Sequence, residues 1–244
     1  MTKTLLWRGM LTGILAALLA TMVARTVAEP QIDLAIGYEE SQAVHAMVAH
    51  HVAPAPVEEE LVSRDTQKGA GLFTALALYG AAVGGIFALI FAYGYGRFGR
   101  LGPRSFALLL ATLAFLLIVI VPGLKYPQTP PAVGRHETVG IRTGAYFMMI
   151  GLSIASALIA ANIRIALLRS WRGIDATLLA TGSYALLVGI GQFLLPAINE
   201  VPEDFPAVLL WNFRIASIGS QFVLWATIGI AFGLLAERAL KQHA

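Results

Sequence analysis

The chain has 244 residues, of which 57% are hydrophobic and only 13% charged, and it carries a net charge of +3. Together with a mean hydropathy of +0.73, this composition excludes an ordinary soluble domain and indicates an integral membrane protein. Because the chain has no cysteine, disulfides, zinc-thiolate sites and cysteine nucleophiles are excluded as well.

Six segments are long and apolar enough to cross a hydrocarbon core, which takes about 20 residues of helix. We expect them at residues 5–27, 69–93, 105–124, 144–168, 174–198 and 215–236. Their apolar runs lack the alternation of barrel strands, and a helix satisfies its own backbone hydrogen bonds in lipid. The sequence therefore predicts an all-α polytopic membrane helix bundle, with residues 1–244 forming one integral membrane domain.

The first of these helices has a second interpretation. Lys3 and Arg8 precede its apolar core and Thr26-Val27-Ala28 follows it, as in a cleavable signal peptide. Arg25 close to the cleavage point and the length of the apolar stretch favour an uncleaved anchor. Cleavage would leave five helices in the same orientation.

Basic residues mark one side of the membrane. If the amino terminus is inside, the cytoplasmic segments hold one acid, Glu237, and the cations Lys3, Arg8, Arg97, Arg100, Arg104, Arg169, Arg172, Arg238 and Lys241. The opposite side is rich in acids. By the positive-inside rule, both the amino and the carboxyl terminus are expected in the cytoplasm.

Residues 29–68 form a long acidic outer segment between the first two helices. A connection of this length usually has a structure or a task of its own. Ile32, Ile36, Ala43 and Met47 follow a rough helical stripe, and prolines soon after it would stop a helix. We expect an amphipathic helix lying over the outer mouth of the bundle.

The same segment carries a candidate metal site made of His45, Met47, His50 and His51, close to Glu39, Glu40 and the acidic run 58–60. Imidazole with carboxylate suits Co²⁺, Ni²⁺ and Zn²⁺, and thioether tolerates softer ions. On a regular helix His45 points about 200° away from Met47, so gathering all four ligands requires unwinding near Ala49 or a second chain. The alternative is a solvated acidic helix with incidental histidines.

Small residues four apart recur inside the predicted helices and indicate close backbone packing. These pairs are Gly9 with Gly13, Gly80 with Gly84, Gly140 with Gly144, and Gly229 with Gly233.

Few polar residues lie at mid-membrane. Asn162, Gln192 and Gln221 are the candidates for lining a path, and hydrogen bonding between helices is the alternative role for each. No carboxylate or histidine is expected there, which weakens a proton-driven mechanism resting on this chain alone.

A proline-rich stretch before the fourth helix is interpreted as an outer cap spanning residues 122–143. Pro122 and Gly123 should end the third helix. Non-helical backbone at membrane depth must be buried in protein or face water, which favours a folded cap with paired charges over an ordinary outer loop. Candidate cap or gating residues are Lys125, Tyr126, Pro127, Pro130, Pro131, His136, Glu137 and Arg142.

Three stretches resemble the family of probable cobalt transporter subunits called CbtA. They are EPQID after the first helix, VSRDTQKGAGLFTA before the second and LKYPQTPPAVGRHETVGIRTGAY before the fourth. The resemblance covers essentially the whole chain and is most specific in the proline loop. It implies Co²⁺ uptake for cobalamin biosynthesis in a bacterial inner membrane, beside a small one-helix, histidine-bearing partner called CbtB.

Within that resemblance, Co²⁺ or Ni²⁺ is the transported ion, and Arg142 and Glu137 brace the cap rather than touch metal. No permanently bound cofactor and no nucleic acid partner are expected, and a homo-oligomer is left open. A second hypothesis is a non-conducting membrane scaffold whose outer face binds a partner helix or an anionic ligand. The sequence has no Walker A, GxSxG or HExxH motif, so we do not expect an enzyme.

Overall fold

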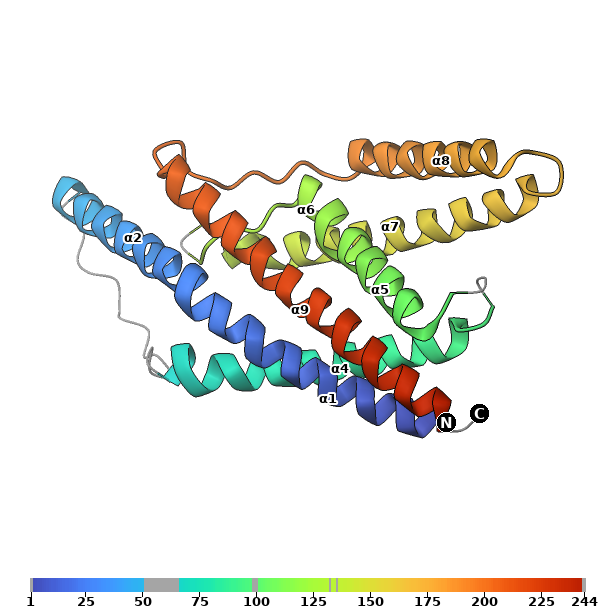
Figure 1. The fold of residues 1–244 in the computed structure, drawn as a ribbon. Coiled ribbons are helices and arrows are strands. Elements are labelled where there is room, and N and C mark those ends of the chain that lie inside the picture. Colours follow the sequence, from blue (N-terminus) through green and yellow to red (C-terminus); the bar gives the residue numbers. More distant parts are fainter. Residues whose placement is uncertain (1, 51–65, 98–100, 132, 135, 243–244) are drawn as a thin grey trace. The chain divides into compact units, whose positions relative to one another are not determined.

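The computed structural model describes residues 2–50, 66–97, 101–131, 133–134 and 136–242, and every regular element among them is a helix (Figure 1). The elements are α1 (Thr2–Val23), η1 (Ala24–Ala28), α2 (Glu29–His50), η2 (Gln67–Gly71), α4 (Leu72–Gly94), α5 (Pro103–Ala114), η3 (Phe115–Ile120), α6 (Val121–Lys125), η4 (His136–Thr138), α7 (Val139–Leu167), α8 (Gly173–Leu194) and α9 (Ala207–Lys241). Six helical segments are long and apolar enough to cross a membrane, which confirms the predicted all-α polytopic fold. The cytoplasmic placement of both termini stays a prediction.

The first span does not stop at the membrane surface. The π-helical η1 joins α1 to α2 with helical backbone at both junctions, so the chain forms one continuous helix there. The part of this helix from Thr2 to His45 has 44 residues, and at 1.5 Å per residue it is about 66 Å long. That is about twice a hydrocarbon core of roughly 30 Å, so part of this helix must lie outside the bilayer.

Two helix ends differ from the predicted ones because proline sets them. α8 ends at Leu194 rather than at residue 198, since Leu195 already has the extended backbone that a following proline imposes. α9 begins at Ala207 rather than at residue 215, directly after Pro206. The polar side chains of Asn212 and Arg214 lowered the apparent hydropathy of its first turns.

The expected stop at Pro122 and Gly123 is wrong, because the third span continues through both residues to Lys125. The π-helical η3 precedes Pro122, as η1 precedes Pro30, and such local widening helps a helix to accommodate a proline. In an α-helix, Pro122 would leave the carbonyl of Ile118 without its usual N–H donor. The hydroxyl of Tyr146 donates a hydrogen bond to that carbonyl over 3.4 Å.

The chain forms two compact units. Unit 1 comprises Met1–Ala114, Thr129–Ala132 and Asp204–Ala244, and unit 2 comprises Phe115–Gln128 and Val133–Glu203. The membrane-spanning elements of unit 1 are α1, α4, α5 and α9, and those of unit 2 include α7 and α8.

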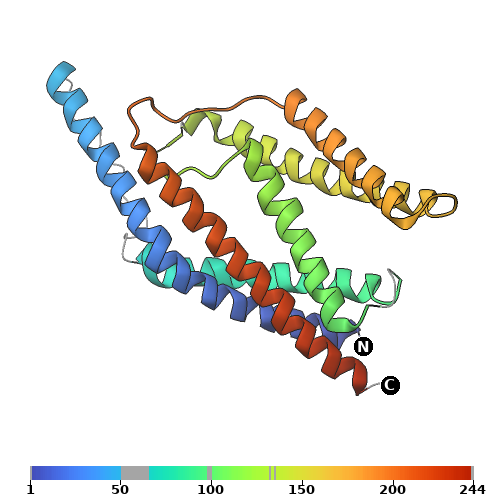
Figure 2. The ribbon, with the colours of Figure 1, turned by 45° about the horizontal axis from the view of Figure 1, so that its top comes forward.

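Glycines join α1 to α4 in unit 1. A Cβ at Gly9 would collide with the carbonyl of Gly84, and a Cβ at Gly13 with that of Gly80. The order of these contacts shows that the two helices run antiparallel, and both views place them side by side (Figure 2). The two predicted glycine pairs therefore form one seam in which the backbones touch.

α9 packs antiparallel to α5 through a second small-residue contact. A Cβ at Gly229 would lie 2.7 Å from the Cβ of Ala111, and one at Gly233 would lie 3.2 Å from that of Ala107. Next to this contact, Phe232 meets the rings of Phe87 and Phe91 of α4 edge-on, with centroids 5.4 and 5.1 Å apart. This aromatic cluster forms the interior of unit 1.

Unit 2 is built around the α7–α8 pair. Leu152 of α7 fills the space beside Gly191 of α8, where a Cβ would collide with it. The hydroxyls of Ser153 and Tyr184 lie 3.0 Å apart and hydrogen-bond across the same pair. The predicted close packing at Gly140 and Gly144 is wrong, because among the residues that the structure describes an added Cβ at either position would meet nothing within 4 Å.

Candidate functional site

The helix α2 is held against the start of α9 by a small polar and aromatic contact. Gln42 donates hydrogen bonds to a carboxylate oxygen of Asp204 at 2.6 Å and to the hydroxyl of Tyr38 at 3.0 Å. The Tyr38 ring meets the buried ring of Phe205 edge-on, with centroids 5.0 Å apart. We call Tyr38, Gln42, Asp204 and Phe205 the outer clasp, and it fixes α2 within unit 1.

His45 lies one turn beyond the clasp on an exposed part of α2. Its Nδ1 is 2.7 Å from the carbonyl oxygen of Ser41. Because a carbonyl only accepts hydrogen bonds, Nδ1 must carry the proton and donate. The lone pair of the neutral ring is therefore on Nε2, and this is the arrangement in which a histidine binds a metal ion.

The other predicted metal ligands are placed less fully. Met47 and His50 belong to α2, but their side chains, like all of His51, lie outside the described residues. The helix α2 does not unwind near Ala49 and stays helical to His50, so of the two ways to gather all four ligands a second chain is the one left open. Among the side chains that the structure describes, no three histidine or acidic residues gather around one point. The four-ligand set stays a prediction.

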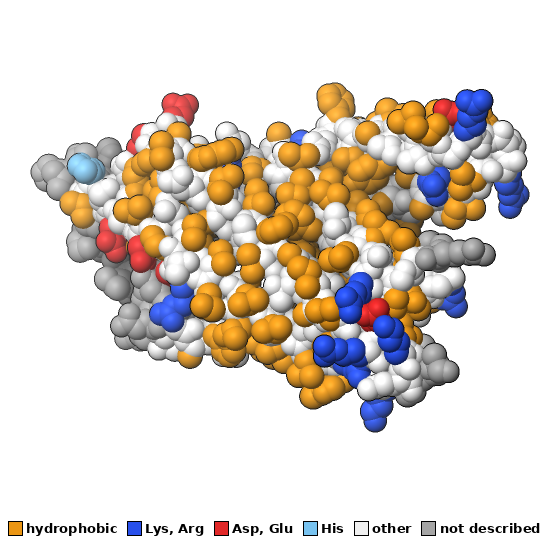
Figure 3. Space-filling view, viewed as in Figure 1, with side chains coloured by type: hydrophobic (Ala, Val, Ile, Leu, Met, Phe, Trp, Pro, Cys, Tyr) orange, Lys and Arg blue, Asp and Glu red, His pale blue; other side chains and the backbone are white. Residues whose placement is uncertain are grey.

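Acidic residues surround the exposed part of α2. Glu39 and Glu40 are exposed on α2 itself, and Asp204 lies in the clasp. Figure 3 shows acidic side chains near α2, whereas lysine and arginine gather where α1 and α9 carry the two termini. Glu39, Glu40 and Asp204 therefore place negative charge beside the exposed part of α2 that carries His45, which favours a divalent cation there.

Most of the predicted cap belongs to unit 2, whereas its residues 129–132 belong to unit 1. The hydroxyl of Tyr126 donates a 2.9 Å hydrogen bond to the carbonyl of Pro196, and burial raises the pKa of this phenol. Arg142 pairs with Glu200, with Nε and a carboxylate oxygen 3.6 Å apart. Tyr126 and Arg142 thus join the cap to the segment that follows α8, and the bracing role of Arg142 stays a prediction.

Gly134 allows the chain to turn beside this ion pair. Its φ of +129° lies in a region that residues with a side chain rarely adopt. A Cβ at this position would also collide with the Arg142 guanidinium. The close approach of guanidinium and backbone therefore depends on the missing side chain.

The remaining cap residues differ in their exposure to solvent. Lys125 ends α6 and Pro127 is half-buried, whereas Pro130 is buried, Pro131 and Glu137 are exposed, and the side chain of His136 is outside the described residues. Gating by this set stays a prediction.

The three polar candidates for a path differ in their surroundings. Asn162 is exposed and donates to the carbonyl of Leu158 in its own helix at 2.8 Å, and Gln192 is half-buried. Gln221 buries its Oε1 without a hydrogen-bond partner among the described residues. Asn162 and Gln192 belong to unit 2 and Gln221 to unit 1, so a shared path stays a prediction.

The sequence did not predict the contact that forms the clasp. Tyr38 and Gln42 stand four apart on one helix face, which is a usable local signal. Asp204 and Phe205 follow more than 160 residues later, and no local pattern connects them with α2.

One protein family matches nearly the whole chain. The family described as "Probable cobalt transporter subunit (CbtA)" matches residues 2–237. No curated protein and no solved structure matches the chain.

Proposed function

The chain belongs to the family of probable cobalt transporter subunits (CbtA), and on that premise we propose that it admits Co²⁺ to the cell for cobalamin biosynthesis. The site of capture is the exposed end of α2, with His45 as its first ligand. Both termini lie in the cytoplasm and α2 lies outside it, in a bacterial inner membrane. A small histidine-bearing subunit completes the transporter.

The observation that supports this proposal most is the availability of His45 Nε2. The carbonyl of Ser41 holds the proton on Nδ1, and the ring is exposed on a helix that the clasp fixes. A single imidazole binds a divalent ion weakly, so further ligands come from Met47, His50, His51 or the partner subunit. Two or more nitrogen ligands make a site that suits Co²⁺ or Ni²⁺.

The charges of unit 1 support the direction of transport. Each nearby carboxylate attracts a unit positive charge by about 1 kcal/mol at 4 Å in water, before screening by salt. The acidic end of unit 1 therefore concentrates the ion, and the basic end marks the cytoplasm by the positive-inside rule. A membrane potential of 100 mV, negative inside, adds about 4.6 kcal/mol for an ion of charge +2.

A scaffold function is the second candidate, and the interior of the described spans favours it. The apolar helices that the structure describes bring no three metal-binding side chains together. In this account another subunit conducts the ion, and the folded cap with Tyr126 and Arg142 binds that subunit.

Accumulation of radioactive cobalt in metal-starved cells distinguishes the two functions. Cells would express this chain alone, with its small partner, or neither. We expect accumulation that requires this chain and falls at least fivefold when His45, His50 and His51 are all replaced by alanine. His243→Ala, which removes a histidine near the other end of the chain, serves as the matched control. Unchanged accumulation in the triple variant would contradict the capture site, and accumulation without this chain would contradict the proposed function.

A further inference from the structure

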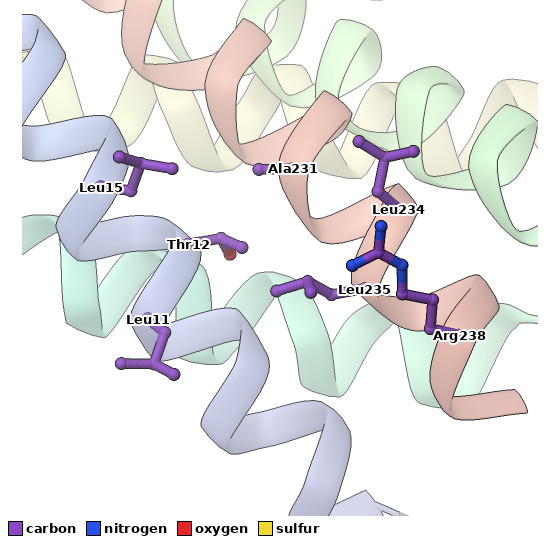
Figure 4. Close-up of a pocket in the computed structure, with 7 residues that line it drawn as sticks. All are labelled: Leu11, Thr12, Leu15, Ala231, Leu234, Leu235 and Arg238. Carbon is purple, nitrogen blue, oxygen red and sulfur yellow. The ribbon is translucent and has the colours of Figure 1, made fainter. Parts of the chain in front are cut away.

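A groove between α1 and α9 lies near the end of unit 1 that carries both termini (Figure 4). Its volume is about 300 Å³, and it is lined by Leu11, Thr12, Leu15, Ala231, Leu234, Leu235 and Arg238. The leucines at its rim are partly exposed, with 45% of Leu11, 45% of Leu15 and 37% of Leu234 accessible. The groove therefore opens on the face that the two helices present to lipid.

The floor of the groove has no unsatisfied polar group. Thr12 is 2% exposed, and its hydroxyl donates to the carbonyl of Gly9 at 2.9 Å. The remaining walls are leucine and alanine side chains. A hydrocarbon chain fits such a surface at no cost in hydrogen bonds, whereas a polar ligand would lose its hydration there.

The guanidinium of Arg238 lines the groove, and that of Arg8 contacts the backbone of the lining residue Leu235. Arg238 is exposed and makes no side-chain hydrogen bond or ion pair with the residues that the structure describes, and its side chain extends toward the groove in Figure 4. Arg8 donates hydrogen bonds to the carbonyl of Leu235 at 2.5 Å and to the side chain of Gln242 at 3.5 Å. A guanidinium has five N–H donors, so Arg8 keeps donors for a further anion.

The local carboxylate does not neutralise these cations. Glu237 is the only acid in the described helices at this end of unit 1. It is already paired with Arg104 at 2.5 Å and with Lys241 at 3.5 Å. The positive charge of Arg8 and Arg238 is thus left for a ligand from outside the chain.

We propose that this groove binds one anionic phospholipid, with its phosphate on Arg238 and Arg8 and part of an acyl chain between the leucines of α1 and α9. The charged and the apolar parts of the groove select the same molecule. The cations attract an anionic group at the membrane surface, and the leucine-lined groove directly beside them accommodates a hydrocarbon chain. The proposal is independent of cobalt transport.

Native mass spectrometry of the purified full chain tests the proposal. The probes are phosphatidylglycerol and phosphatidylcholine with identical acyl chains. We expect the chain to retain one phosphatidylglycerol molecule at least fivefold better than phosphatidylcholine. Arg238→Gln should abolish this preference, whereas Arg172→Gln, which removes an exposed cation from unit 2, should leave it within twofold. Equal retention of the two lipids, or equal effects of the two substitutions, would overturn the proposal.

A second variant tests the apolar half of the site. Ala231→Phe places a ring in the groove without changing the charge, and it should lower retention of both lipids. Circular dichroism and elution as a single species check that the variant is folded. Unaltered retention of phosphatidylglycerol in the folded variant contradicts the proposed acyl-chain position. If Ala231→Phe instead converts a dimer into a monomer, the groove holds a second copy of this chain and the lipid assignment is overturned.

Discussion

The α1–α4 pair of unit 1 and the α7–α8 pair of unit 2 are joined by different means. In the first, Gly9, Gly13, Gly80 and Gly84 bring two backbones into contact. In the second, one glycine receives a leucine side chain, and two side-chain hydrogen bonds, Ser153–Tyr184 and Arg164–Thr177, cross the interface. Lipid is as apolar as leucine, so close van der Waals packing holds membrane helices together more than apolar character does.

Exposure of the side chains reflects the same difference. One third of the apolar window of α4 is buried, against 17% of that of α8. Phe193 of α8 is 88% exposed, whereas Phe232 in the interior of unit 1 is 0% exposed. The comparison shows that unit 1 has an interior of its own, and that α8 presents most of its side chains outward.

The most damaging single change should be Gly84→Ala in the α1–α4 seam. The new methyl group would collide with backbone atoms of Gly9, which cannot move aside as a side chain can. We expect a loss of about 3 kcal/mol in the free energy of unfolding. Thermal unfolding of the purified chain in detergent measures it.

Gly182→Ala is the matched control for that substitution. A Cβ at this position of α8 meets nothing within 4 Å, so higher helix propensity should leave the stability unchanged or raise it by up to about 1 kcal/mol. Equal unfolding temperatures for Gly84→Ala and Gly182→Ala would remove the distinction between the two helix pairs.

Gly134→Ala should have the next largest effect, confined to the cap of unit 2. The added side chain suffers an unfavourable φ and a collision with Arg142, together about 2 kcal/mol. Limited proteolysis between α6 and α7 should become faster. In an Arg142→Ala background the same substitution should cost less, and an equal cost in both backgrounds would show that the guanidinium is not its cause.

Gln42→Ala should loosen the outer clasp without unfolding unit 1. It removes the hydrogen bonds to Asp204 and Tyr38, and the end of α2 should then open more often. We expect several-fold faster hydrogen exchange of the backbone amides at residues 38–45, with unchanged exchange in α4. Gln31→Ala, on the same helix and nearer to the membrane, is the control, and faster exchange there to the same extent would contradict the role of the clasp.

The smallest effect is expected at the exposed face of α8. Phe193→Ala removes a ring that touches little of this chain, so the free energy of unfolding should change by no more than about 0.5 kcal/mol. Phe232→Ala, in the aromatic cluster of unit 1, should cost several times more in the same unfolding measurement. A large loss for Phe193→Ala would show that α8 is packed more tightly than its exposure indicates.

Hydropathy was sufficient to predict the six spans, because lipid requires about 20 apolar residues whatever the tertiary contacts are. The exact ends of the helices depend on prolines and on contacts between residues far apart in the sequence. Leu195 is extended because of the proline that follows it, and Pro122 is tolerated inside a helix because Tyr146, 28 residues from Ile118, hydrogen-bonds the carbonyl there. No local pattern reveals that distant hydroxyl.

Glycine spacing predicted close packing but not where it occurs. The glycine pair that begins at Gly9 packs against the pair that begins at Gly80 on another helix. A Cβ added at Gly140 would meet no described residue within 4 Å. Glycines four residues apart show that a helix has a face without side chains, and only the fold determines whether another helix packs against that face. The candidate ligand His45 was likewise visible in the sequence, but the state of its ring depends on the contact with Ser41.

Titration of the purified full chain in lipid nanodiscs with Co²⁺ tests the capture site most directly. The visible absorption of Co²⁺ changes when nitrogen ligands replace water, and the account predicts such a change at a stoichiometry of one ion per chain or per complex with the small partner. It predicts at least tenfold weaker binding when His45, His50 and His51 are replaced by alanine, and unchanged binding in His243→Ala. Binding of equal strength in the triple variant would contradict metal capture by α2.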